Sequence, residues 1–142
     1  MADQTTPRHE VVARQDILGS AGEARHAATT KAVLHQVAEA ETALFRLRPG
    51  GRIKSHSHST VWDLFLGIEG EVTISWTDGT REVASMVLAR NGFVAIPPGW
   101  SHEVANHSNA REAAFVLIHA PWEGYDHLPD RRAVQAGADT QA

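Results

Sequence analysis

Cysteine is absent from this chain of 142 residues. Disulfide cross-links, thiolate metal ligands and cysteine nucleophiles are therefore excluded. A chain without disulfides is compatible with a reducing compartment, and we expect the protein to be cytoplasmic.

Long apolar runs and a strong excess of one charge are also missing. No apolar stretch approaches the ~20 residues that cross a bilayer, and residues 1–7 lack the basic and apolar regions of a secretory signal. The formal net charge is only −4. We therefore expect neither a nucleic-acid partner nor a membrane partner. The length and the hydrophobic content of 42% suit one globular domain with one core.

Turn residues divide most of the sequence into short β-like segments. The strongest turn signals are Pro-Gly-Gly at 49–51, Asp-Gly at 78–79, Asn-Gly at 91–92 and Pro-Pro-Gly at 97–99. From residue 30 the apolar pattern has a period of two, interrupted by a polar segment at 39–41 that we interpret as a turn. Short strands at regular spacing, without a long helical pattern, predict an all-β sandwich or barrel.

These patterns also suggest how the chain is divided. We expect one barrel domain over residues 30–128, an N-terminal arm over 1–29 that is partly disordered, and a C-terminal tail over 129–142. Within the arm, residues 11–18 fit either a strand or a loose arm, and the Ala-, Gly- and Thr-rich residues 19–29 are interpreted as a connection.

The chain has nine histidines, which is a high count for its length. His56 and His58 stand two apart in a segment expected to be extended, where residues i and i+2 point to the same face. Asp63 follows after enough residues for a turn and a return strand, and His102 lies just beyond the Pro-Pro-Gly turn. Three imidazoles and one carboxylate form a sound ligand set for a divalent transition metal. The alternative is that these are unrelated polar residues on the surface. The His-x-His pair alone would favour that alternative, but the Pro-Pro-Gly turn followed by His102 weighs against it.

Together the two segments resemble the two motifs of the cupin family. The first motif is glycine, five residues, His-x-His, three or four residues, an acid, six residues and glycine, and it is met by Gly50, His56, His58, Asp63 and Gly70. The second motif includes Pro-x-Gly, two residues, histidine, three residues and asparagine, and it is met by Pro97, Gly99, His102 and Asn106. The glycine that opens the second motif is displaced by one residue, to position 92.

The resemblance implies a double-stranded β-helix, which is a jelly-roll β-barrel. It also implies one divalent transition metal ion (Fe, Mn, Ni or Zn) held by His56, His58, Asp63 and His102. The family normally has glutamate where this chain has Asp63, whose side chain is one methylene shorter. Three arrangements stay open for this carboxylate: it binds the metal directly, binds through a water, or accepts a hydrogen bond from a ligating imidazole.

Open coordination positions inside a barrel are typical of a catalytic metal site. We therefore expect a metal-dependent enzyme acting on a small polar or carboxylated metabolite, of the dioxygenase, isomerase, lyase or decarboxylase type. A non-catalytic metal- or ligand-binding or sensing cupin is the alternative. The expected partner is a small molecule, together with a second copy of the chain: the resemblance implies a homodimer, in which residues 11–18 pair with or cross onto the other subunit.

Four further residues lie near the predicted site in sequence or by strand parity. Phe65 is interpreted as a core aromatic rather than a pocket wall. Lys54 shares the parity of the histidine pair and is expected to be solvated rather than bound to an anionic substrate. Asn106 is expected to be a turn residue. His119 lies on the last predicted strand. Its side chain could point inward, near the metal, or outward, and the sequence does not decide between the two, so His119 is not included among the predicted ligands.

Overall fold

A computed structural model describes residues 9–26, 28–80 and 82–130 of the chain. These residues contain eleven β-strands and no α-helix, and therefore no helix that is long and apolar enough to cross a membrane. The strands are β1 (Glu23–His26), β2 (Thr29–Val37), β3 (Ala40–Leu47), β4 (Arg52–Ser57), β5 (Trp62–Glu69), β6 (Val72–Thr77), β7 (Ala84–Leu88), β8 (Phe93–Ile96), β9 (Ser101–Ala105), β10 (Ala113–Ala120) and β11 (Leu128–Pro129). The all-β prediction is confirmed.

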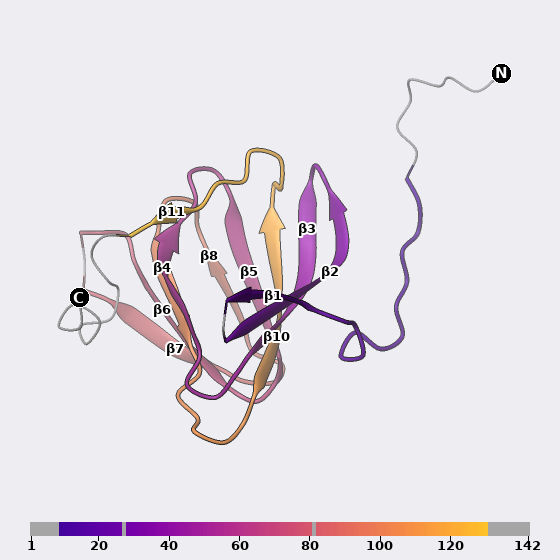
Figure 1. Cartoon of the computed structure of the whole chain (residues 1–142). Helices are drawn as coiled ribbons and strands as arrows, with labels where there is room; N and C mark the ends of the chain where they lie inside the picture. The colour runs from indigo at the N-terminus through magenta and orange to yellow at the C-terminus, as the bar shows by residue number, and fades with distance from the viewer. Residues whose placement is uncertain (1–8, 27, 81, 131–142) are drawn as a thin grey trace.

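The strands form two antiparallel sheets that face each other (Figure 1). The larger sheet has the order β1-β2-β3-β10-β5-β8, and the smaller has the order β11-β4-β9-β6-β7. Chain neighbours such as β3 and β4 lie in different sheets, so the chain passes repeatedly from one sheet to the other. Residues from distant parts of the sequence therefore meet between the sheets.

Side chains on the inner face of the larger sheet form rows that cross several strands. One row consists of Ala43, Leu117 and Phe65, which are direct partners across β3, β10 and β5 and are all buried. In the next row the rings of Phe45 and Phe115 stack with their centroids 5.6 Å apart. These rows fill one end of the space between the sheets and form the apolar core.

The row on the other side of Leu117 is polar instead of apolar. Glu41 on β3, His119 on β10 and Asp63 on β5 are direct cross-strand partners, and each is less than 5% exposed. Buried ionisable groups require partners, so this end of the barrel is built for polar contacts. The interpretation of residues 39–41 as a turn is wrong for Ala40 and Glu41: the turn lies at residues 38–39, and β3 begins at Ala40.

The segment before residue 30 departs from the sequence interpretation. The composition of residues 19–29 predicts a connection, but residues 23–26 form β1 and pair with β2. Residues 11–18 form no strand in the structure. Ile17 and Leu18 pack against the outer face of the larger sheet, beside Leu44 and Val116. Apolar contacts, not strand pairing, therefore hold this part of the arm.

The ends of the proposed domain remain a prediction. β11 pairs with β4 and extends the smaller sheet as far as Pro129, one residue past the predicted boundary. Residues 1–8 and 131–142, where disorder and a tail were predicted, lie outside the described residues.

Gly67 allows a close approach between β5 and the turn at 89–92. Its N–H donates to the Gly92 carbonyl at 2.9 Å, and a Cβ at this position would lie 1.9 Å from the Ala89 carbonyl oxygen. Because the obstructing atom is backbone, Gly67→Ala must separate the strand from the turn. We expect it to lower the free energy of unfolding by about 3 kcal/mol, as measured by urea denaturation.

Gly79→Ala is the matched control. A Cβ on Gly79 meets nothing within 4 Å, although its φ is +90°. Only backbone strain of about 1 kcal/mol is expected. Equal losses for the two variants would contradict the close approach at Gly67.

Candidate metal centre

Four buried side chains from three strands and one turn converge near the polar end of the barrel. His56 lies on β4, His58 directly follows that strand, Asp63 lies on β5 and His102 lies on β9. One donor atom of each lies within 4.8 Å of the others, and none of the four residues is more than 6% exposed. The structure therefore brings together all four residues predicted from the sequence.

Strand pairing and one tight turn explain this convergence. His56 on β4 is the direct partner of His102 on β9, so their side chains are neighbours across the smaller sheet. The turn before β9 is fixed to the end of β4, because the Gly99 N–H donates to the His58 carbonyl at 2.7 Å. Gly99 has a φ of +83°, a conformation that glycine adopts without strain. The Pro-x-Gly spacing thus sets where His102 enters the barrel.

Each of the three histidines is held through its Nδ1 atom by a backbone carbonyl. The pairs are His56 with Lys54 at 2.7 Å, His58 with Asp126 at 2.6 Å, and His102 with Trp100 at 3.1 Å. A carbonyl oxygen only accepts hydrogen bonds, so Nδ1 carries the proton. In a neutral imidazole, Nε2 then presents a lone pair. This is the arrangement by which proteins orient histidine ligands toward a metal.

The Asp63 carboxylate faces these Nε2 atoms. His58 Nε2 lies 3.1 Å from Oδ1, and His102 Nε2 lies 3.2 Å from Oδ2. Within the described part of the chain, His58 Nε2 and Asp63 Oδ1 are nevertheless buried without a hydrogen-bond partner. Buried polar atoms without partners are costly. A divalent cation among these donors would satisfy both atoms, so the residues present fit a metal ion.

Burial and neighbouring charges set the ionisation of the site. Burial, followed by the nearby His102, lowers the pKa of His56 to about 3, so its imidazole is neutral at pH 7. Burial alone would disfavour an Asp63 carboxylate, but the neighbouring imidazoles of His102, His119 and His58 hold the pKa of Asp63 well below its usual range. The centre thus offers a neutral nitrogen donor and an anionic oxygen donor at neutral pH.

His119 is part of this centre, although the sequence analysis did not include it among the ligands. Its Nε2 lies 3.2 Å from Asp63 Oδ2, and its Nδ1 lies 3.8 Å from Glu41 Oε1. The sequence could have indicated this position only through strand periodicity: residues 115, 117 and 119 are spaced by two, so their side chains lie on the same face of the strand. This periodicity does not tell which face of the strand is inward. The pairing of His119 with Asp63 and Glu41 joins strands that are far apart in the sequence, so no local pattern predicts it.

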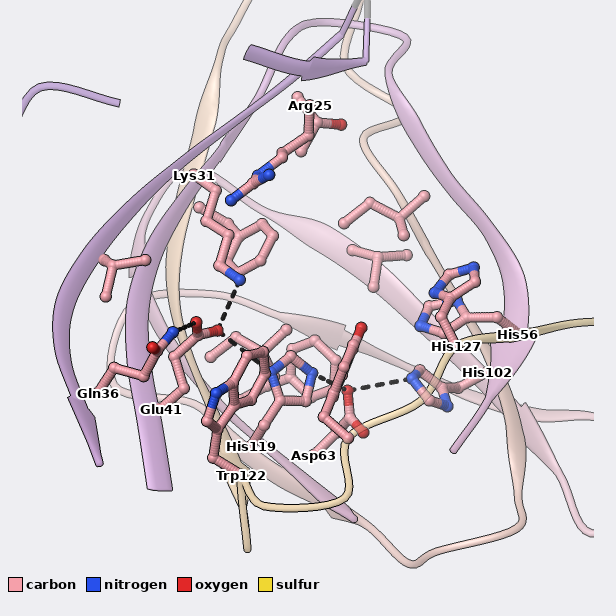
Figure 2. A pocket seen from close by; sticks show the side chains of 18 residues that line it. Arg25, Lys31, Gln36, Glu41, His56, Asp63, His102, His119, Trp122 and His127 are labelled. Atoms are coloured by element: carbon pink, nitrogen blue, oxygen red, sulfur yellow. Dashed lines mark hydrogen bonds and ion pairs between the residues drawn. The ribbon is translucent and has the colours of Figure 1, made fainter. Parts of the chain in front are cut away.

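A cavity of about 460 Å³ opens onto the centre from between the sheets. Figure 2 shows His56, His102 and His127 on one side of it, the Lys31–Glu41 pair on the other, and His119 and Asp63 between them. The volume suits a small organic molecule.

Two aromatic residues after β10 close part of this cavity. Tyr125 stacks on Trp122 with ring centroids 4.5 Å apart and contacts the rings of His58 and His119. Burial, assisted by the charge of Asp63, raises the pKa of Tyr125 to about 12, so its hydroxyl remains a hydrogen-bond donor at neutral pH. No motif in the sequence points to this tyrosine.

The other residues singled out from the sequence have clear positions. Phe65 is in the core as predicted and also lines the cavity, where its ring and that of His102 are nearly perpendicular. Lys54 is exposed, as predicted. The Asn106 side-chain amide donates to the carbonyls of Leu47 and Arg111, which confirms its role as a turn residue.

Comparisons with known proteins agree with this geometry. A family model described as a cupin domain matches residues 43–119. The structure is similar to the polyketide cyclase RemF from Streptomyces resistomycificus, with a TM-score of 0.71 and 16% identity, covering 93% of this chain and 94% of that one. It is also similar to an uncharacterized protein with a double-stranded β-helix domain from Klebsiella pneumoniae, with a TM-score of 0.68 and 18% identity, covering 93% and 98%.

A third similar structure is that of an oxalate oxidase, with a TM-score of 0.67 and 18% identity, covering 89% of this chain and 67% of that one. No protein of curated function matches the sequence. At these identities the structural likeness shows the fold alone. It confirms the predicted double-stranded β-helix.

Proposed function

This chain belongs to the cupin family, and we propose that it is a metal-dependent enzyme acting on a small polar or carboxylated metabolite inside the barrel. The observation that carries the proposal is the convergence of three carbonyl-anchored imidazoles and a buried carboxylate at the end of a ligand-sized cavity. A purely structural site would not need a cavity opening onto its donors.

In this proposal His56, His58 and His102 hold one divalent transition metal ion (Fe, Mn, Ni or Zn), with Asp63 as a direct or water-bridged fourth ligand. Such an ion supplies Lewis-acid chemistry, polarising a carbonyl or carboxylate group of the substrate. The cavity walls of Ile53, Val104 and Leu117 bind the apolar part of the substrate and exclude water from the reacting end.

Proton-transfer reactions, those of an isomerase or lyase, are the best supported of the reaction types. His119 stands beside Asp63, and its Nδ1 has no hydrogen-bond partner among the residues that the structure describes. In this proposal it therefore accepts a proton from the substrate. Tyr125 donates a hydrogen bond to a developing negative charge. An acid and a base that flank one cavity are what proton abstraction next to a carbonyl requires.

The first prediction concerns the histidines. His56→Ala, His58→Ala or His102→Ala is expected to remove most of the metal from the purified protein, measured by elemental analysis. The exposed His107 gives the control His107→Ala, which is expected to keep wild-type metal content. Metal-loaded wild type is expected to incorporate solvent deuterium into at least one member of a panel of small keto acids and diketones in D₂O, observed by NMR.

Each readout has an outcome that contradicts the proposal. Wild-type metal content in all three histidine variants would mean that the metal, if any, binds elsewhere. Oxygen uptake without deuterium exchange would favour a dioxygenase over proton transfer. A metal-loaded protein that binds members of the panel and turns over none would favour the non-catalytic sensing cupin.

Asp63 has a separate test, because its side chain is shorter than the glutamate usual in the family. Asp63→Ala is expected to weaken metal binding by about 10–100-fold, the effect typical of residues that support a metal site. Asp63→Glu is expected to keep or improve the affinity, since it restores the longer reach. If Asp63→Ala binds metal as tightly as wild type at neutral pH, the carboxylate neither ligates the ion nor supports its ligands.

We also propose a homodimer. Support comes from apolar side chains on the outer face of the larger sheet: Leu66 and Phe93 are cross-strand partners and are 40% and 56% exposed, and Trp62 on the same strand as Leu66 is 43% exposed. Val11 in the arm is 96% exposed and is expected to contact the second subunit. Sedimentation at micromolar concentration is expected to give twice the chain mass, and a monomer would contradict the proposal.

A further inference from the structure

The two ends of the cavity come from different parts of the chain. The candidate metal donors lie within the segment that matches the family model, residues 43–119. At the other end the lining includes Arg25, Thr29 and Lys31, which belong to β1 and β2 and precede that segment. We therefore expect β1 and β2, which precede the family segment, to contribute to selectivity for the substrate.

Arg25 is directed to the cavity by an irregularity of β1. The pairing with β2 shifts register between Ala24 and His26, so Arg25 is the extra residue of a β-bulge. Bulges change the direction of a side chain and occur often beside active sites. Figure 2 shows the guanidinium extending over the cavity toward Lys31. Among the described residues Arg25 forms no ion pair.

Thr29 adds an unused hydrogen-bonding group at the same end. The residue is 2% exposed and lines the cavity, and its hydroxyl oxygen is buried without a hydrogen-bond partner in the described part of the chain. An unpaired buried hydroxyl costs stability, and such a cost is accepted where a ligand supplies the missing partner.

The charges at this end sum to one positive charge. Lys31 Nζ lies 2.6 Å from Glu41 Oε1, so this pair is neutral overall. The ammonium also lies 5.7 Å from the ring centroid of Phe45 and 5.3 Å from that of Trp122, which hold it in place. Arg25 is then the uncompensated cation, and it matches a ligand with a single negative charge.

We propose that Arg25, Thr29 and Lys31 form a carboxylate-binding subsite. The substrate class is a monoanionic carboxylate with an apolar body, bound with its carboxylate at β1 and β2 and its reacting group at the metal centre. The planar guanidinium suits a carboxylate, because it can donate two parallel hydrogen bonds. The Thr29 hydroxyl donates a further one. This inference rests on the proposed function for the identity of the reacting end, but the subsite can be tested by itself.

The test compares two probes that differ in charge and not in shape, 3-phenylpropionate and 3-phenylpropanamide, by calorimetric titration into metal-loaded protein. Wild type is expected to bind the carboxylate at least about tenfold more tightly than the amide. Arg25→Gln is expected to weaken carboxylate binding at least about tenfold and to leave amide binding within about twofold. Thr29→Val, which keeps the side-chain shape, is expected to weaken carboxylate binding without lowering the melting temperature.

Arg48→Gln is the matched control, because Arg48 is exposed and does not line the cavity. It removes the same charge and is expected to leave both affinities unchanged. Two results would overturn the inference: no preference of wild type for the carboxylate, or an Arg25→Gln effect no larger than that of Arg48→Gln. If wild type prefers the carboxylate but Arg25→Gln has no larger effect than Arg48→Gln, the carboxylate binds at the metal and not at Arg25.

Metal content, measured in parallel, separates this inference from the proposed function. If the metal content is normal but the preference for the carboxylate does not depend on Arg25, the subsite is rejected and the proposed function is not affected. If wild-type protein takes up no metal, the same titrations are carried out without metal, and an Arg25-dependent preference there supports the subsite and defeats the proposed function.

Discussion

The burial of the Asp63 carboxylate among imidazoles is the constraint on which the rest of the site depends. A carboxylate that is 1% exposed is stable only with positive charge or hydrogen-bond donors around it. Three imidazoles face it through Nε2, and two of them, those of His58 and His102, are held by carbonyls at Nδ1. A neutral imidazole held in this way has no proton to give at Nε2. The arrangement therefore calls for a cation, either a proton or a metal ion.

The barrel supplies the rigidity that such a site needs. Neighbouring rows on the inner face of one sheet are apolar and close-packed, while the row of Glu41, His119 and Asp63 ends in the cavity. Donors that lie on paired strands move little when a ligand binds, so their geometry is set before the ligand arrives. The same register gives the cavity its two chemically different ends, one with histidines and one with Arg25 and Lys31.

The sequence predicted those parts of the site that depend on local spacing. His56 and His58 come together because they are two residues apart in the extended chain at the end of β4, and His102 follows a turn whose glycine adopts a positive φ. His119 and Glu41 depend on the register between β3, β10 and β5, which no short pattern encodes. The direction of the Arg25 side chain depends on a bulge in β1, and the composition of residues 19–29 did not indicate a strand there.

In this proposal three histidine Nε2 atoms hold one metal ion at the end of the cavity. Anomalous X-ray diffraction from crystals of the metal-loaded protein can locate that ion, because the anomalous signal does not depend on activity. We expect one strong peak between the Nε2 atoms of His56, His58 and His102, with Asp63 oriented toward it. A peak at another position, or no peak in crystals grown from protein with stoichiometric metal, would show that these histidines do not hold the ion.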